Sequence, residues 1–238
     1  MRTLVLLGWL LVPVAFGAYH YGPGQERLRL DDAASVLAEA DRLAAAEDWQ
    51  SAVAKFDAAQ AMLPEGRVED VRRIRLKRAK AQMFAHQLPE ASAALQDLVE
   101  QLQDDKSASA QLRDEAREAQ ASAQYYITWL KRLEGLSEQE WQPDIESARQ
   151  SYRLLAEKAE SSGDQVAARR HREDLESAIR LARMDVGELQ GLAIPTQCQG
   201  CKSGQCKKPG RKPSNSKNEQ KKDARGASSG PPPDKSGS

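Results

Sequence analysis

The chain has 238 residues, enough for one domain of ordinary size with a hydrophobic core and flanking segments. Its 35 basic and 35 acidic residues cancel, which excludes a global charge that would draw the whole molecule to nucleic acid or anionic lipid. β-branched and aromatic residues are scarce, and Ala, Leu, Glu, Gln and Arg dominate the middle, so intrinsic propensity favours an all-α fold.

Residues 1–21 predict export. A single basic residue precedes an uncharged apolar run, which is the pattern of a signal peptide. Ala15 and Gly17 suit a signal-peptidase cut after Gly17, whereas Tyr19 and Tyr21 suit the aromatic belt of a retained membrane anchor. Both alternatives place the body outside the cytoplasm, in the periplasm if the host is bacterial and anchored in the inner membrane if the segment is kept. A third alternative is a buried N-terminal helix of a cytosolic protein.

Residues 22–30 are expected to form a linker, followed by a helical domain over residues 31–192. The apolar spacing predicts helices over residues 31–46 and 49–64, joined by a two-residue turn. So short a connection requires the two helices to lie antiparallel. The same design returns over residues 67–86 and 89–103, so we expect a second hairpin.

The two hairpins share a pattern of small and large side chains at matching positions. The residues that carry it are Ala40, Trp49, Ala52, Phe56, Ala59 and Pro64 in the first, and Ala79, Leu88, Ala91, Leu95 and Leu98 in the second. This pattern resembles the tetratricopeptide repeat (TPR), a helix-turn-helix unit with a small residue in its first helix and an aromatic residue opening its second. The resemblance implies a short array of stacked antiparallel helical hairpins.

A third, longer hairpin is predicted from residue 108 onward. Apolar residues recur at alternating steps of four and three, the heptad seam of a supercoiled helix, with Ser107 as its cap. They are Leu112, Ala116, Ala119, Ala123, Tyr126, Leu130 and Leu133. Ser137 and Glu140 predict a capping box that opens a short turn, and the partner helix is expected after Pro143.

A last helix is predicted over residues 165–189 as the cap of the array. Its expected apolar stripe includes Ala168, Leu175 and Ile179. The expected polar outer face consists of Arg169, Arg170, Arg172, Glu173, Asp174 and Glu176.

Residues 193–238 are rich in Lys, Gly, Pro and Ser and have almost no large apolar side chain, so we expect a disordered basic tail. The tail lacks aromatic residues between its charges, which argues against nucleic-acid binding.

All three cysteines, Cys198, Cys201 and Cys206, lie in this tail segment. Their spacing suits three thiolate ligands of a zinc ion, with a fourth ligand from a histidine or a second molecule. In an exported protein, two of them would instead form a disulfide and leave one thiol for intermolecular pairing, hence self-association. The third alternative is an exposed segment without a role.

The remaining aromatic and titratable residues favour structural roles. We interpret His86 and His171 as structural. Most of the aromatic residues are expected in the core between helices. Tyr125 and Trp129 are one helical turn apart and off the heptad seam, so the alternative for these two is that they line a groove and contact a partner.

The sequence contains no Ser-His-Asp arrangement, phosphate-binding glycine loop or HExxH helix, so we do not expect an enzyme. The function expected is an exported or membrane-anchored scaffold that binds a protein or peptide partner. The alternative is a metal or thiol-redox module centred on the three cysteines.

Overall fold

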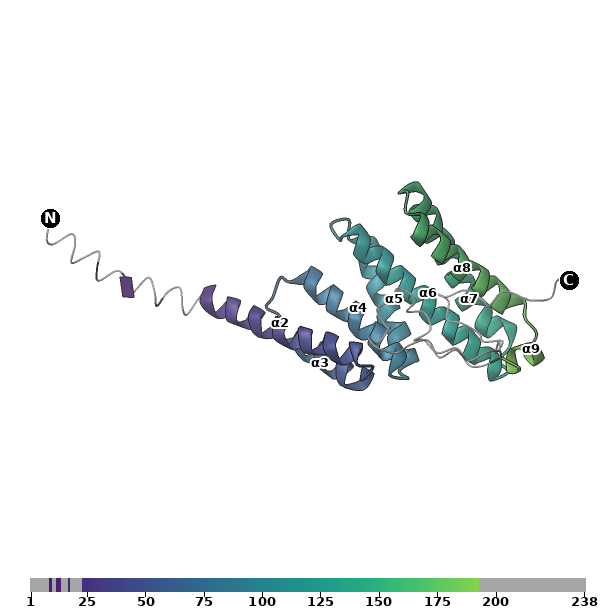
Figure 1. Cartoon of the computed structure of the whole chain (residues 1–238), viewed down its shortest axis with the longest axis horizontal. Coiled ribbons are helices and arrows are strands. Elements are labelled where there is room, and N and C mark those ends of the chain that lie inside the picture. Colours follow the sequence, from purple (N-terminus) through teal and green to yellow (C-terminus); the bar gives the residue numbers. More distant parts are fainter. Residues whose placement is uncertain (1–8, 10–11, 14–16, 18–22, 193–238) are drawn as a thin grey trace, which may run out of the picture. The chain divides into compact units, whose positions relative to one another are not determined.

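A computed structural model describes residues 9, 12–13, 17 and 23–192, and all regular structure in these residues is helical (Figure 1). The predicted all-α class is therefore confirmed. The helices are α2 (Pro23–Ala45), α3 (Trp49–Met62), α4 (Val68–Phe84), α5 (Leu88–Asp104), α6 (Ala110–Leu133), α7 (Glu138–Ser161), α8 (Gln165–Arg183) and α9 (Val186–Gln190).

The predictions for residues 193–238 lie outside the described residues, as do those for residues 1–21 except at positions 9, 12–13 and 17. None of the helices in the described part of the chain is long and apolar enough to cross a membrane.

The chain divides into two compact units, residues 1–78 and residues 79–238. The boundary falls within α4, directly after Arg78, so the domain predicted over residues 31–192 contains parts of both units.

Unit 1 contains the hairpin of α2 and α3, which pack against each other. Ala40 on α2 and Ala52 and Ala59 on α3 have no exposed surface, and Phe56 is 2 % exposed. Alanines let two helix axes approach closely, because no atom beyond Cβ separates them. The aromatic ring then fills the remaining space of the hairpin.

The turn between α2 and α3 is fixed by local chemistry. Glu47 takes a positive φ of 64°, and Asp48 caps α3 by accepting a hydrogen bond from the Ser51 backbone N–H at 3.3 Å. A short carboxylate at this position satisfies an amide hydrogen that has no partner within the helix. The predicted turn and the start of the next helix at Trp49 are thus both observed.

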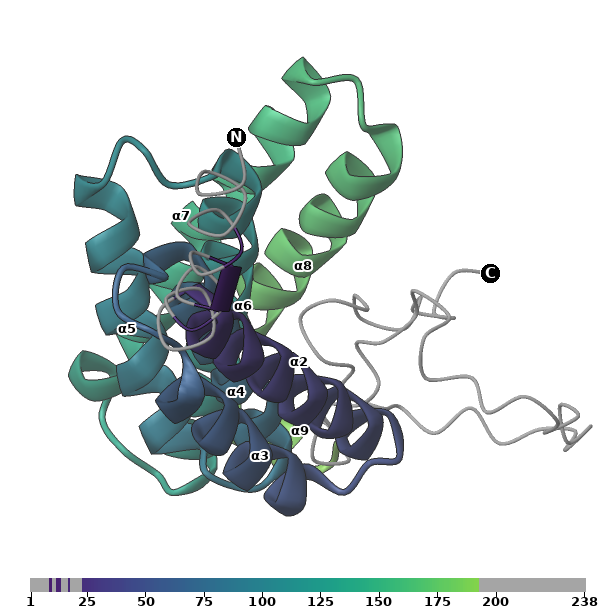
Figure 2. The same cartoon turned by 90° about the vertical axis from the view of Figure 1, so that its left-hand side faces the viewer.

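In unit 2, helices α5, α6, α7 and α8 pack in chain order, and α9 returns to pack against α6 (Figures 1 and 2). Helix α6 therefore contacts α5, α7 and α9. Helix α8 packs against α7. It exposes Arg169, Arg172 and Glu173, which belong to the polar outer face predicted for the last helix of the array.

A buried arginine joins the end of α6 to the end of α8. The Arg132 guanidinium donates hydrogen bonds to the backbone carbonyls of Leu181 and Met184, and it lies 4.7 Å from the ring centroid of Trp141. Carbonyls in the last turn of a helix lack partners within the helix, so this side chain satisfies them. Burial lowers the pKa of Arg132, and Asp185 and Glu138 oppose that shift.

The single helix predicted over residues 165–189 is wrong, because it is broken after Arg183. Met184 takes an extended conformation, and Asp185 caps α9 by accepting from the Glu188 N–H at 2.7 Å. The apolar spacing continues across the break, but the cap starts a new helix.

The boundaries of two other helices also differ from the prediction. Helix α2 begins at Pro23, so the predicted linker over residues 22–30 is helical from that point. Proline is tolerated in a first helical turn, and the Glu, Arg and Leu that follow are strong helix formers. Pro143 lies inside α7 instead of preceding it, as the sixth residue of that helix, because the capping box already starts the helix at Glu138.

Capping was predicted correctly at one helix and wrongly at another. Ser109, not Ser107, caps α6 by accepting from the Leu112 N–H at 3.2 Å. The Ser107 hydroxyl instead donates to the carboxylate of Asp105 at 2.6 Å.

The predicted capping box at the start of α7 is confirmed. The Glu140 carboxylate accepts hydrogen bonds from the Ser137 hydroxyl and the Ser137 backbone N–H, both at 2.8 Å. These bonds lower the pKa of Glu140, the hydroxyl contributing most.

We expect the capping box to make stability depend on pH. Because the pKa of Glu140 is lower in the folded state, its stabilisation is present above the unfolded pKa and is lost as pH falls through the folded pKa. Glu140→Ala should therefore lower the melting temperature at pH 7, and the difference from wild type should shrink as pH falls from the unfolded pKa of about 4.3 and vanish below the folded pKa. Circular dichroism melting curves over this pH range measure both effects.

Glu138→Ala is the matched control, since Glu138 is also an acidic residue in the first turn of α7. If Glu138→Ala lowered the melting temperature as much as Glu140→Ala at every pH, the stabilisation would come from negative charge at the helix N-terminus and not from the capping box.

Candidate functional site

A group of polar side chains lies inside unit 2. Among the fully or nearly fully buried ones, Thr128 and Ser177 donate to backbone carbonyls one turn earlier, both at 2.8 Å. Such bonds satisfy a hydroxyl within its own helix. His171 and Asp174 have no comparable local partner, which distinguishes them from the other buried polar residues.

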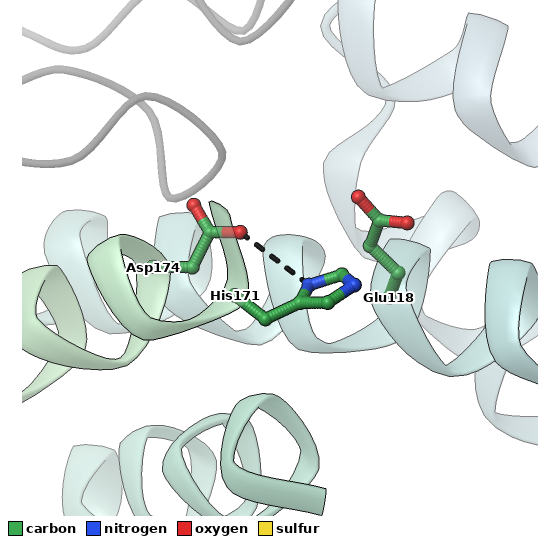
Figure 3. Close-up of side chains that lie close together, drawn as sticks. All are labelled: Glu118, His171 and Asp174. Carbon is green, nitrogen blue, oxygen red and sulfur yellow. Dashed lines mark ion pairs between the residues drawn. The ribbon is translucent and has the colours of Figure 1, made fainter. Parts of the chain in front are cut away.

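His171 and Asp174 lie on the same face of α8, three residues apart (Figure 3). They are 5 % and 0 % exposed, and the His171 Nδ1 atom is 3.8 Å from the Asp174 Oδ2 atom. In the described part of the chain, neither oxygen of Asp174 nor Nδ1 of His171 has a hydrogen-bond partner. Since buried polar atoms are nearly always paired, this is the most unusual feature of the unit.

A third side chain, Glu118 of α6, faces the pair from the neighbouring helix (Figure 3). One potential ligand atom from each of Glu118, His171 and Asp174 lies within 4.8 Å of the other two. Glu118 also forms an ion pair with Arg170 at 3.2 Å, nearer the surface. We call these three residues the carboxylate–histidine cluster.

Two residues of the cluster, Asp174 and His171, have shifted pKa values. Burial raises the pKa of Asp174, as does the nearby negative charge of Glu118, and the Arg170 guanidinium opposes the shift. Burial lowers the pKa of His171, and Glu118 opposes that shift. In both residues the apolar surroundings favour the neutral form, so a charged group here requires a compensating partner.

The Tyr152 hydroxyl of α7 belongs to the same interior region. It is buried and has no hydrogen-bond partner among the described residues. Burial raises the pKa of Tyr152, with further contributions from Asp174 and Tyr126. Helices α6, α7 and α8 therefore each contribute a polar side-chain atom to the same interior region.

This cluster was not predicted from the sequence, and Asp174 was assigned wrongly to the outer face of α8. The buried stripe is Ala168, His171, Asp174, Ser177, Ala178 and Leu181. It lies one position away from the predicted stripe of Leu175 and Ile179, which are only half-buried. The available signal was a histidine and an aspartate three residues apart, in register with Ala168 and Ala178.

The predicted exposure of Tyr125 and Trp129 is wrong, because these residues are 3 % and 2 % exposed. The Tyr125 ring lies edge-on to Tyr126 at a centroid distance of 5.6 Å, and 6.3 Å from the Trp129 ring. Leu130, assigned to the seam, is 41 % exposed instead. Helix α6 has neighbours on more than one side, so a single heptad seam does not describe what it buries.

Unit 1 contains a pocket of about 270 Å³ between α2, the end of α3 and α4. Its apolar lining is Leu30, Ala33, Ala34, Leu37, Leu63 and Ile74. Asp70, Arg73 and Lys77 of α4 form the polar part. Lys77 pairs with Asp41 at 2.8 Å, which connects α4 to α2 beside the pocket.

Cys198, Cys201 and Cys206 lie outside the described residues, so zinc ligation, disulfide formation and the absence of a role all stay predictions. His86 has a positive φ of 61° directly after α4, consistent with a structural position at a helix end.

No family model, curated protein or solved structure matches the chain.

The burial of Trp129 predicts a large difference between two adjacent substitutions. Trp129→Ala removes a core side chain and should lower the free energy of unfolding by about 3–5 kcal/mol. Leu130→Ala, the matched control, should cost less than about 1 kcal/mol because Leu130 is partly exposed. Urea denaturation followed by circular dichroism measures both, and equal losses would contradict the burial of α6 described above.

Proposed function

We propose that the protein is a non-catalytic scaffold that binds a protein or peptide partner. The pocket of unit 1 carries the proposal. Its apolar lining is partly exposed: Leu30, Leu37 and Leu63 are half-buried, and Ala34 is exposed. Apolar side chains around a concave surface favour a ligand that covers them.

The size and lining of the pocket indicate what the partner inserts. Its volume of about 270 Å³ is below the ~300–1,000 Å³ typical of small-molecule sites. It suits one or two aliphatic side chains of a peptide segment. Asp70, Arg73 and Lys77 would then contact the polar backbone or flanking residues of that segment.

The arrangement of the helices supports the same function. The pocket lies between α2 and α4, the first helices of the two hairpins predicted from the sequence. In an array of hairpins, successive first helices form a continuous surface suited to an extended partner. The resemblance of Trp49–Pro64 to the TPR pattern favours this interpretation.

The apolar N-terminal sequence supports a location outside the cytoplasm. An uncharged run following one basic residue is typical of an export signal or membrane anchor. We therefore propose that the partner is an exported or membrane protein.

Ala34→Arg tests the proposal, because it places a charged side chain at the exposed edge of the pocket. A partner cross-linked to the full-length chain in its native host is first identified. A peptide from that partner is then titrated by fluorescence polarisation. We expect Ala34→Arg to weaken peptide binding at least about tenfold, since the charge would be buried against aliphatic surface.

Ser35→Arg is the matched control, because Ser35 is exposed on the same helix but does not line the pocket. It should leave the affinity unchanged. Replacing the large aliphatic residues of the peptide by alanine should abolish binding. Equal binding by wild type and Ala34→Arg, with unchanged helix content, would refute the proposed site.

A further inference from the structure

We propose that Glu118, His171 and Asp174 form a binding site for a divalent transition-metal ion in the interior of unit 2. The site is built from α6 and α8, so it does not depend on the proposed partner pocket. It is also separate in sequence from the cysteines of the tail.

The spacing of the ligand atoms fits an ion better than it fits direct hydrogen bonding. The 3.8 Å between His171 Nδ1 and Asp174 Oδ2 exceeds hydrogen-bond length. Two ligands of a tetrahedral ion, each about 2.05 Å from the metal, are roughly 3.4 Å apart. A shift of a few tenths of an ångström would therefore bring these two atoms to ligand spacing.

Glu118 of α6 can supply the third ligand. The ligand atoms of all three residues already lie within 4.8 Å of one another. Glu118 is only half-buried, and its side chain has more rotatable bonds than that of aspartate, so it can move inward toward the pair. Figure 3 shows its carboxylate on the far side of the histidine ring from Asp174.

The unpaired atoms provide independent support for a missing ligand. Both oxygens of Asp174 are buried without a hydrogen bond, and so is the Tyr152 hydroxyl contributed by α7. A carboxylate taken out of water without a partner is strongly destabilising. A bound cation would compensate the charge of Asp174, and Tyr152 is placed nearby as a further oxygen donor.

Arg170 is the positive group that a metal ion must tolerate. Its guanidinium pairs with Glu118 at 3.2 Å, and its side chain is 42 % exposed, so solvent screens its repulsion of a bound cation. The Arg170 Nη2 atom lies 3.2 Å from one Glu118 oxygen and 3.3 Å from the other, so Glu118 keeps one of these contacts and gives up the other when it turns an oxygen toward the ion. When the cation replaces the proton of Asp174, the two carboxylates and Arg170 together leave one net negative charge beside the ion.

The type of ligand indicates the class of metal. One imidazole nitrogen with carboxylate oxygens suits zinc and similar first-row ions better than calcium or magnesium, which prefer oxygen ligands alone. Zinc is therefore the probe of choice.

The experiment uses the full-length chain with Cys198→Ser, Cys201→Ser and Cys206→Ser, so that the tail thiols cannot bind the probe. After treatment with EDTA, zinc is titrated by isothermal calorimetry. We expect one ion per chain with a Kd of about 10 μM or tighter, and a rise in melting temperature with zinc because the ion binds the folded state.

Variants of the cluster identify the site. Asp174→Asn and Glu118→Gln should each weaken zinc binding at least about tenfold, and each removes a charge with little change in shape. Glu118 is the half-buried member, so its variant keeps the test valid if Asp174→Asn does not fold. Glu173→Gln is the control: it removes the same charge from an exposed neighbouring position and should leave the Kd unchanged.

Three outcomes would overturn the proposal. One is no stoichiometric zinc binding by the cysteine-free chain. Another is a Kd above about 1 mM, typical of adventitious binding to surface groups. The third is unchanged affinity in both folded cluster variants, which would place the ion elsewhere.

Discussion

The position of α6 determines most of what is unusual in unit 2. This helix is in contact with α5, α7 and α9, so it must bury more of its circumference than an amphipathic surface helix does. Alanines at positions such as Ala116 and Ala123, which have no exposed surface, allow that close approach. The large rings of Tyr125 and Trp129 on the same helix are also almost fully buried. Glu118 on α6 reaches past this packing to pair with Arg170 of α8 and to lie near His171 and Asp174.

Elements set by local chemistry could be predicted from the sequence, and those set by tertiary contacts could not. The start of α3 at Trp49 and the Ser137–Glu140 capping box depend on residues within a few positions of each other. The burial of Trp129 depends instead on how many helices surround α6. Likewise, the burial of Asp174 depends on which face of α8 meets its neighbours. Moving the predicted apolar stripe by one position transfers Asp174 from the exposed face to the buried face.

The carboxylate–histidine cluster illustrates why such a shift matters physically. A charged residue on the outer face of a helix costs little, but the same residue without a partner in the interior must lose its charge, bind a cation or destabilise the fold. Burial raises the pKa of Asp174, which is the first of these responses. Helix α8 keeps His171 on the same face, so the interior holds both a nitrogen and oxygen donors.

The two units therefore offer different chemistry, although both are built from helical hairpins. Unit 1 has a partly exposed aliphatic pocket, which can discriminate partners mainly by the shape of the side chains they insert. In unit 2 the unusual chemistry lies in the interior, where unpaired oxygens and an imidazole would favour a small cation over any peptide. An ion held between α6 and α8 would connect two helices that flank α7, so its effect would be on the rigidity of the row of helices. Because the pocket and the cluster share no residue, loss of either would leave the residues of the other intact.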